Sequence, residues 1–331
     1  MKIVCFVSAS SWVLNSGMRK LAEALNRASV NAEICDLHGD MPSADYYFYS
    51  VRDHLLHHAQ KYRGTFLSQS CFIHTHLEEA NFKHAYIFKQ CAVVFFMNKK
   101  EIDVGCYAMS LHRGQAAYLP WPVDPEIFFL KRIKDEVEEL NLRPTVGFSL
   151  KYQPDNPRYA SRKNYEVVLG VARGLANAGL AVEVLGPNWE VFNKVHNLSG
   201  RLRFREDSYV DYNRIYNCWD YVCSLSSYEG GPVGVLEAMR AGCYPILSKT
   251  GHFEEVLGLS SSNNDQPFIT ENGCHLPVGE SVDTYISQIL YVLDQVSISS
   301  VMRRRISKNA LAWCPERGAK AIIAALAAHR M

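Results

Sequence analysis

Two glutamates, Glu229 and Glu237, stand eight positions apart and are separated by a glycine pair and a proline. The strand-like run 221–225 leads into this segment, and a second strand-like run, 243–247, leads out of it. In α/β proteins a strand, a glycine turn and a helix N-terminus present a binding crevice at the carboxyl edge of the sheet. The segment therefore predicts a crevice whose ligand is held by one or both carboxylates.

The proline indicates what this crevice would hold. Pro232 suits the first position of a helix, because its missing N–H would have no partner there. The amides that follow would point into the crevice, and the helix dipole favours an anion such as a phosphate. Glu237 lies in a run that is otherwise apolar except for Arg240, and a buried carboxylate is costly without a partner.

A plainer interpretation stays open for both glutamates. Glu237 and Arg240 are three residues apart and could form an ion pair on the helix surface. Glu229 could merely cap the helix. The spacing alone does not decide between these structural roles and a ligand-binding pair.

The composition is that of a soluble globular protein of two domains. The chain has 331 residues, of which 48% are hydrophobic and 21% charged, as expected for a chain with a full core. Its net charge of +1 leaves a nucleic-acid partner no electrostatic attraction. Ten cysteines without paired spacing indicate buried thiols in a reducing compartment rather than disulfides or a zinc site.

The apolar segments argue against export and against a membrane span. Residues 3–7 are expected to form a buried strand rather than a signal peptide, because the apolar region is short and no clean cleavage site follows. No stretch approaches the ~18 uninterrupted apolar residues of a membrane span. The sequence predicts a cytoplasmic protein and leaves open a peripheral contact with the inner face of a membrane.

Strand and helix signals alternate on both sides of the proline-rich segment 118–125, where three prolines cannot continue a helix or a central strand. Such alternation implies parallel strands joined by right-handed crossovers. We expect two doubly wound Rossmann-like domains, 1–120 and 121–314, and a C-terminal helix, 315–331, that would pack back on the first domain. The expected strands are 3–7, 32–37, 45–50, 65–73, 92–97, 145–150, 181–185, 202–205, 221–225, 243–247 and 275–278, and the expected helices are 17–29, 54–62, 163–178, 209–217, 280–296 and 302–313.

The full string around the two glutamates resembles the nucleotide-sugar signature of the retaining glycosyltransferases of family four. The matching residues are Ser226, Glu229, Gly230, Pro232, Leu236, Glu237, Ala238, Met239 and Gly242. The linker is similar to the family's Pro-x-Val-Asp-x-x-x-Phe string, with Val123, Asp124 and Phe128 in place. The resemblance covers residues 120–290 and implies the GT-B fold, an α/β architecture of two doubly wound Rossmann-like domains with a cleft between them.

The resemblance also assigns roles to the donor-side residues. Glu237 would accept hydrogen bonds from the ribose hydroxyls, since a carboxylate can accept from two adjacent hydroxyls. Glu229 would contact the donor sugar near the reacting centre. Gly186 resembles the family's nucleotide-contacting turn, and Gly251 resembles the start of its Gly-x-x-Glu-x-Val step. The remaining implied donor contacts are Ser226, Gly230, Gly231, Pro232 and Val233.

A diphosphate leaving group needs positive charge, which a metal or fixed cations with helix amides can supply. The chain has no Asp-x-Asp metal motif, so the sequence predicts that neither a metal nor another cofactor is required. Lys151, Arg158, Arg162 and Lys163 follow the strand 145–150. By the family's spacing Arg158 and Lys163 would reach the diphosphate, with Lys151 as a substitute for Arg158. The other interpretation is that these residues are solvated loop charges.

The first domain supplies two further candidates. Gly17 stands where the family has a glycine-rich turn, ahead of a helix, so that its amide would face the diphosphate. His74 resembles the family's histidine that faces the donor sugar, and His76 is the second choice. A structural role at the strand end stays open for His74, and no third metal ligand accompanies the pair. The histidines of the helix 54–62 are expected on its exposed face.

The predicted function is therefore a metal-independent, retaining transfer of a hexose from a UDP- or GDP-sugar to a carbohydrate or lipid-linked acceptor. In the family the acceptor attacks the donor sugar on the same face from which the leaving group departs. The departing phosphate helps to take the proton of the acceptor. One alternative is a nucleotide-sugar epimerase or phosphorylase-like enzyme on the same scaffold, which sugar-nucleotide turnover without an acceptor would favour. The other is an inactive module that binds sugar nucleotides, against which the intact glutamate pair argues.

Overall fold

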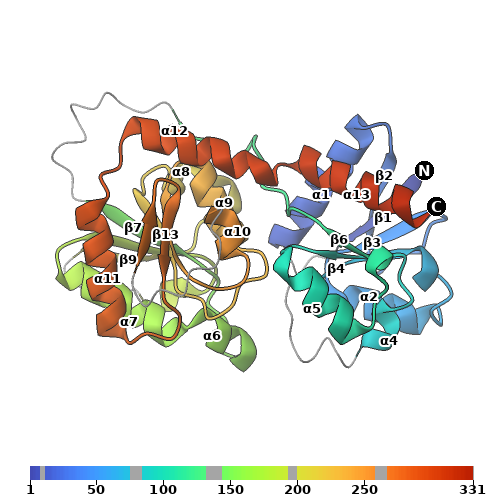
Figure 1. Cartoon of the computed structure of the whole chain (residues 1–331), viewed down its shortest axis with the longest axis horizontal. Coiled ribbons are helices and arrows are strands. Elements are labelled where there is room, and N and C mark those ends of the chain that lie inside the picture. Colours follow the sequence, from blue (N-terminus) through green and yellow to red (C-terminus); the bar gives the residue numbers. More distant parts are fainter. Residues whose placement is uncertain (8–11, 75–83, 132–143, 193–199, 258–266, 331) are drawn as a thin grey trace. The chain divides into compact units, whose positions relative to one another are not determined.

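A computed structural model describes residues 1–7, 12–74, 84–131, 144–192, 200–257 and 267–330. The chain forms two compact units, of which the first comprises Met1–Asp124 and Ala312–Met331 and the second Pro125–Leu311. Each unit has its own sheet with helices packed around it (Figure 1). The prediction of an α/β chain with two Rossmann-like domains is confirmed. The boundary between the two units lies between Asp124 and Pro125, four residues after the boundary that the sequence predicts between residues 120 and 121.

Among the residues described, the first unit has a six-stranded parallel sheet in the order β2-β1-β3-β4-β5-β6. Strand β2 lies on one side of β1, and the later strands lie on the other side, starting with β3. The strand order therefore reverses between β1 and β3, as in other doubly wound sheets. The strands are β1 Lys2–Val7, β2 Asn31–Asp36, β3 Tyr46–Tyr49, β4 Ser70–His74, β5 Val93–Phe96 and β6 Ala116–Tyr118. The helices are α1 Trp12–Arg27, α2 Arg52–Lys61, α4 Ala85–Phe88, α5 Lys100–Met109 and α13 Pro315–His329.

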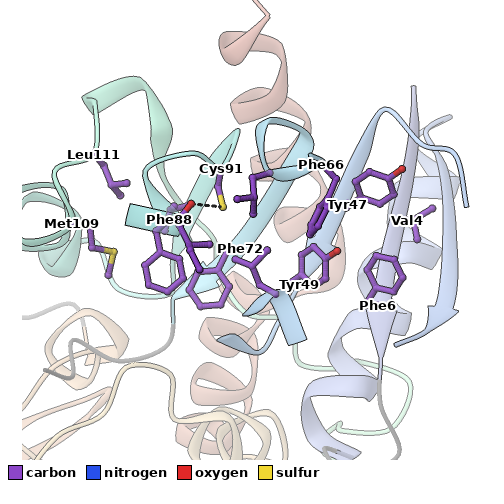
Figure 2. Close-up of a cluster of buried hydrophobic side chains, with 14 of the residues drawn as sticks. Val4, Phe6, Tyr47, Tyr49, Phe66, Phe72, Phe88, Cys91, Met109 and Leu111 are labelled. Atoms are coloured by element: carbon purple, nitrogen blue, oxygen red, sulfur yellow. Dashed lines mark hydrogen bonds between the residues drawn. The ribbon is translucent and has the colours of Figure 1, made fainter. Parts of the chain in front are cut away.

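An aromatic cluster fills the space between this sheet and α2, α4 and α5 (Figure 2). Phe6 stacks on Tyr49 with ring centroids 5.0 Å apart, and Phe72 stacks on Phe88 at 4.8 Å. Stacked aromatic pairs add to the free energy gained from burying their area. The central strands β1, β3 and β5 are largely apolar and buried, as expected for parallel strands covered on both faces.

The prediction that the α2 histidines are exposed is wrong for two of them. His58 is fully buried, where its Nδ1 lies 2.9 Å from the Tyr49 hydroxyl and its Nε2 2.7 Å from the Leu37 carbonyl. His54 is 7% exposed, and only His57 lies on the exposed face. Burial lowers the pKa of both His54 and His58, because it penalises the charged ring.

The first helix starts earlier than predicted. Helix α1 begins at Trp12, so Gly17 lies in its second turn rather than ahead of it. A Cβ on Gly17 would come within 2.4 Å of the Trp121 ring. Gly17 therefore allows close packing between α1 and the segment after β6, and its amide is not at the helix N-terminus.

The C-terminal helix α13 packs on α1 within the first unit (Figure 1). A Cβ on Gly318 would come within 2.6 Å of the Leu21 side chain, so the two helices approach closely where α13 carries a glycine. Arg27 of α1 pairs with Glu316 of α13 at 2.6 Å. The chain thus starts the first unit, builds the second and returns to complete the first.

The described residues of the second unit form a seven-stranded sheet in the order β12-β13-β11-β10-β7-β8-β9, in which only the β12–β13 pair is antiparallel. The strands are β7 Thr145–Ser149, β8 Ala181–Leu185, β9 Leu202–Arg205, β10 Tyr221–Ser224, β11 Tyr244–Ser248, β12 Phe268–Thr270 and β13 Gly273–Leu276. The helices are α6 Pro157–Lys163, α7 Tyr165–Asn177, α8 Tyr212–Tyr216, α9 Val233–Arg240, α10 Phe253–Leu257, α11 Val282–Gln295 and α12 Ser300–Asn309. Strand order reverses between β7 and β10, which places a crevice at the carboxyl ends of these two strands.

In the part of the chain that the structure describes, no helix has the length and apolar character needed to cross a membrane.

Candidate active site

The two glutamates lie at the reversal point of the second sheet. Strand β10 ends at Ser224, the loop that follows carries Glu229, and α9 carries Glu237. Helix α6, from the connection after β7, brings Arg162 and Lys163 to the same place. Two segments that are far apart in the sequence, α6 and the stretch from β10 to α9, therefore meet at one carboxyl edge.

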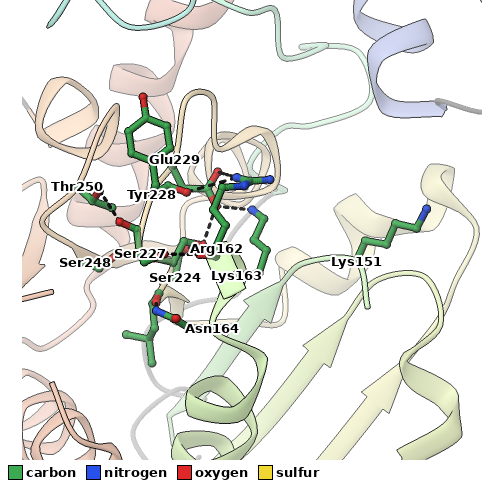
Figure 3. A network of polar contacts seen from close by, with 12 residues as sticks. Lys151, Arg162, Lys163, Asn164, Ser224, Ser227, Tyr228, Glu229, Ser248 and Thr250 are labelled. Atoms are coloured by element: carbon green, nitrogen blue, oxygen red, sulfur yellow. Dashed lines mark hydrogen bonds and ion pairs between the residues drawn. The ribbon is translucent and has the colours of Figure 1, made fainter. Parts of the chain in front are cut away.

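The loop that carries Glu229 is fixed by the neighbouring strand β11 and the turn after it. The Ser248 hydroxyl donates to the Ser226 carbonyl at 2.5 Å, and the Thr250 hydroxyl donates to the Ser227 carbonyl at 2.9 Å (Figure 3). The His252 amide donates to the Glu229 carbonyl at 2.9 Å. These bonds satisfy the loop's carbonyls, so the backbone on both sides of Glu229 is held in place.

Gly251 is required for this arrangement. Its φ of +52° is in the left-handed region, and an added Cβ would come within 2.1 Å of the Glu229 carbonyl oxygen. Any side chain at this position would push the backbone of Glu229 away from the turn. The resemblance at Gly251 thus corresponds to a contact with the backbone of the first glutamate.

Glu229 is the centre of a buried polar cluster. Its side chain is 2% exposed and forms an ion pair with Lys163, and its second oxygen lies 3.3 Å from an Arg162 guanidinium nitrogen. The Ser226 hydroxyl donates to the first oxygen at 2.6 Å. Burial alone would raise the pKa of Glu229, but the charges of Lys163 and Arg162 outweigh it and hold the pKa at about 2. Glu229 is therefore ionised at neutral pH.

The cation that accompanies Lys163 at Glu229 is Arg162, whereas the sequence spacing predicts Arg158. Asn156 caps α6 and Pro157 occupies its first turn, so the predicted loop is a short helix that presents its last two residues to Glu229. Arg158 lies one turn earlier and is exposed. Lys151 lies apart from the cluster (Figure 3). The pair Asn156-Pro157 is the sequence signal that marks the start of this helix.

Glu237 is also buried, at 2% exposure, but among the described residues no cation forms an ion pair with it. Its two oxygens accept hydrogen bonds from the Tyr209 and Tyr216 hydroxyls, the latter at 3.3 Å. Ser149, at the end of β7, extends the chain of hydroxyls with a 2.7 Å bond to Tyr216. Burial raises the pKa of Glu237 to about 8, although both tyrosines counter this. Glu237 thus differs from Glu229 in charge at neutral pH.

The structural alternatives for the two glutamates do not describe what is observed. Arg240 donates hydrogen bonds to the Ser307 carbonyl and hydroxyl at 2.7 and 2.8 Å. Glu237, on the same helix, accepts its hydrogen bond from Tyr209 instead. The N-cap of α9 is Pro232, and it has no side-chain cap in the described structure. The prediction of Pro232 at the first helical position is therefore off by one residue.

The glycine turn brings the start of α9 close to β7. A Cβ on Gly234 would come within 2.6 Å of the Ser149 hydroxyl. Gly230 is buried, and Gly231 and Val233 are partly exposed at the N-terminal end of α9. The start of α9 therefore lies against the end of β7, where Ser149 connects through Tyr216 to Glu237.

Gly186 follows β8 and has a φ of +150°, where an added Cβ would come within 2.1 Å of the Leu150 carbonyl oxygen. This close approach holds the connection after β7 against the end of β8. It positions the start of the segment that leads to α6. The nucleotide contact predicted for Gly186 stays a prediction.

The histidine candidates belong to the first unit. His74 is the last residue of β4 and is paired with Phe96 of β5 in the sheet register. His76 lies outside the described residues. Within the described residues no group of three or more metal-ligating side chains occurs.

Comparison with known proteins places this site in a family context. Residues 156–313 match the family model described as glycosyl transferases group 1. No curated protein sequence matches the chain. The matched segment includes both glutamates, Arg162 and Lys163.

Solved structures resemble the chain over nearly its whole length. Sucrose-phosphate synthase from Thermosynechococcus elongatus has a TM-score of 0.73 at 14% identity, with 98% of each chain covered. Anabaena HepE in complex with UDP-glucose has a TM-score of 0.69 at 12% identity, with 99% of each chain covered. The catalytic domain of starch synthase IV from Arabidopsis thaliana, bound to ADP and acarbose, has a TM-score of 0.70 at 11% identity, covering 100% of this chain and 99% of that one.

The fold is therefore GT-B, as the sequence predicted. By its matched domain, residues 156–313, the protein is of the glycosyltransferase class.

Proposed function

We propose that the protein is a retaining, metal-independent glycosyltransferase of the family-four type, which moves a hexose from a UDP- or GDP-sugar to a carbohydrate or lipid-linked acceptor. The observation that carries the proposal is the cluster around Glu229. One ionised carboxylate fixes two cations, Arg162 and Lys163, at the reversal point of a parallel sheet. Ligands of such sheets bind at this point.

The two cations supply the charge that a diphosphate leaving group needs. The Arg162 and Lys163 side chains are 11% and 14% exposed, so they are largely desolvated and yet reachable from the crevice. Charges fixed in advance stabilise a developing negative charge without reorganisation at the moment of reaction. The amides at the start of α9 add the positive end of a helix dipole. No metal or other cofactor is needed for this role.

Glu237 supports the assignment of a ribose contact. Its oxygens already accept from two hydroxyl groups, those of Tyr209 and Tyr216, and a ribose presents the same type of donor pair. Glu229 then holds the cations and borders the donor sugar. Under this proposal the Glu-x7-Glu spacing separates a sugar-side carboxylate from a ribose-side carboxylate.

The relatives support the donor class. The HepE structures contain UDP-glucose, UDP with glucose, and UDP. We infer a nucleotide-sugar donor for this chain as well. We further propose a cytoplasmic location, with the acceptor, if it is lipid-linked, met at a membrane surface.

The decisive experiment compares two arginines of one helix. Arg162→Met should weaken binding of UDP or GDP at least tenfold and reduce transfer by more, because it removes a cation at the leaving group. Arg158→Met, the matched control one turn earlier, should leave both unchanged. Calorimetry measures nucleotide binding, and release of the nucleoside diphosphate measures transfer with and without EDTA.

Equal effects of the two substitutions would refute the assignment of the cations. Activity lost in EDTA and restored by manganese would refute metal independence. Release of the other sugar anomer would refute retention, and sugar-nucleotide turnover that needs no acceptor would favour the epimerase alternative.

A further inference from the structure

A pocket of about 260 Å³ opens on the first unit, between α2, the turn that follows it, and α4. None of the described residues that were assigned to the donor site lines it. Figure 1 shows α2 and α4 on the same side of the first sheet. The glycosyl transfer chemistry proposed for the second unit makes no use of this pocket.

The pocket lies toward the amino edge of its sheet. The turn after α2 leads into β4 at Ser70, and α4 leads into β5 at Val93. In a parallel α/β sheet the helices return the chain to the amino ends of the strands, whereas substrates bind at the carboxyl ends. The pocket is therefore separate from the crevice that the fold itself provides.

The floor of the pocket is part of the hydrophobic core. Leu67 and Ile87 line it and are 4% and 7% exposed. Both belong to the aromatic cluster, next to the Phe66 and Phe88 side chains seen in Figure 2. A floor of this kind offers no hydrogen bonds, so it favours an apolar group.

The rim of the pocket is polar and carries positive charge. Arg63 lines the pocket and is exposed, and none of its guanidinium nitrogens has a partner in the described structure. The Nδ1 atom of His84, also a lining residue, is buried without a hydrogen-bond partner. Among the residues that the structure describes, no aspartate or glutamate lines the pocket. An unpaired buried polar atom is costly, and a ligand that bonds to it removes that cost.

We propose that this pocket binds a small amphiphilic anion, with one carboxylate or phosphate group against Arg63 and His84 and a short apolar tail on Leu67 and Ile87. The volume corresponds to roughly nine water molecules at ~30 Å³ each. It is below the ~300–1,000 Å³ of sites for drug-sized ligands, which limits the tail to a few carbons. The site would act as a second, independent binding site on the first unit.

The test uses hexyl phosphate as the probe and isothermal titration calorimetry of the full chain. Hexyl phosphate should bind with a stoichiometry of one, and inorganic phosphate and hexanol should each bind at least tenfold more weakly. Hexanoate as a second probe distinguishes a carboxylate ligand from a phosphate ligand. In ¹H–¹³C spectra the ring signals of His84, assigned with His84→Gln, should shift on binding.

Two variants locate the site. Arg63→Asn removes the charge, and asparagine tolerates the left-handed φ of +53° at this position. It should lower the affinity for hexyl phosphate at least tenfold. Lys61→Gln, the matched control, removes the same charge from the last residue of α2, which does not line the pocket, and should leave the affinity unchanged. Ala59→Phe should fill the pocket and abolish binding.

The proposal is overturned if none of the probes binds, or if inorganic phosphate binds as tightly as hexyl phosphate. Equal losses in Arg63→Asn and Lys61→Gln would also overturn it, since they would indicate general charge attraction. If Ala59→Phe fails to fold, the comparison of Arg63→Asn with Lys61→Gln still decides. Nucleotide binding by the second unit should be unaffected in every variant, which separates this result from that of the proposed function.

Discussion

At the scale of single residues, the two glutamates are equally buried and yet carry opposite protonation at neutral pH. Two cations hold the pKa of Glu229 at about 2, whereas burial raises the pKa of Glu237 to about 8. The difference follows from their neighbours, because α6 brings cations to the first, whereas the short 3-10 helix Tyr209–Asp211 and α8 bring tyrosine hydroxyls to the second. A neutral Glu237 can donate one hydrogen bond as well as accept, which suits a ligand with both kinds of group.

Glu237→Gln should stabilise the protein relative to wild type as the pH rises. The pKa of Glu237 is raised from 4.5 to about 8, so its contribution is fully present below pH 4.5 and is lost as the pH rises through 8. Glutamine does not titrate, and the difference in unfolding free energy should shift by up to about 5 kcal/mol over this range. Urea unfolding at pH 5, 6, 7 and 8 measures the shift. If the difference in unfolding free energy between variant and wild type stayed constant with pH, Glu237 would be charged throughout this range. Weaker nucleotide binding by the variant would follow separately from the proposed ribose contact of Glu237.

At the scale of elements, most of the architecture follows from local patterns. Strand β9 was predicted at its observed limits, 202–205, because apolar residues alternate there between polar turns. The motif around Glu229 was found because its residues are contiguous. The sequence spacing favours Arg158 over Arg162, because the contact with Glu229 depends on where α6 starts. Arg158 lies four residues before Arg162, which is about 6 Å along the helix axis.

The buried histidines of α2 show why other features could not be predicted. His58 looks like part of a polar helix face, but its partners are Tyr49 of β3 and the Leu37 carbonyl after β2. These partners are separated from it by 9 and 21 residues. No local pattern contains such contacts, because they arise only when the sheet is assembled.

The turn after β11 is the element that fixes Glu229, and Gly251→Ala tests this. Alanine at a φ of +52° costs about 1 kcal/mol from the backbone alone, and its Cβ would also clash with the Glu229 carbonyl. Gly279→Ala is the matched control, since Gly279 has a φ of +83° and no atom within 4 Å of an added Cβ. Gly251→Ala should cost at least about 1 kcal/mol more in urea unfolding and should abolish nucleotide binding. Equal costs and intact binding in both variants would mean that the turn does not position Glu229.

At the scale of the whole molecule, the second unit is inserted into the first, because α13 returns to α1 after the second unit is complete. Removal of residues 315–331 should therefore destabilise the first unit, although the deleted residues follow the second unit in the sequence. Ala319, Ile322 and Leu326 are at most 1% exposed, and burial of each large aliphatic side chain contributes about 1.5–3 kcal/mol. Loss of this helix should remove at least about 3 kcal/mol from the first unit.

Hydrogen exchange resolves this effect by unit. In the truncated chain, amides of β1, β2 and α1 should lose protection, whereas those of β7, β10 and α9 should keep it, and nucleotide binding should persist. Deletion of residues 330 and 331 alone is the control, because the described partners of Arg330 are Asp45 and Tyr46 at the surface and such pairs contribute little. Uniform loss of protection across both units would instead show that the two units unfold as one cooperative system, in which α13 stabilises the donor site as much as the sheet it covers.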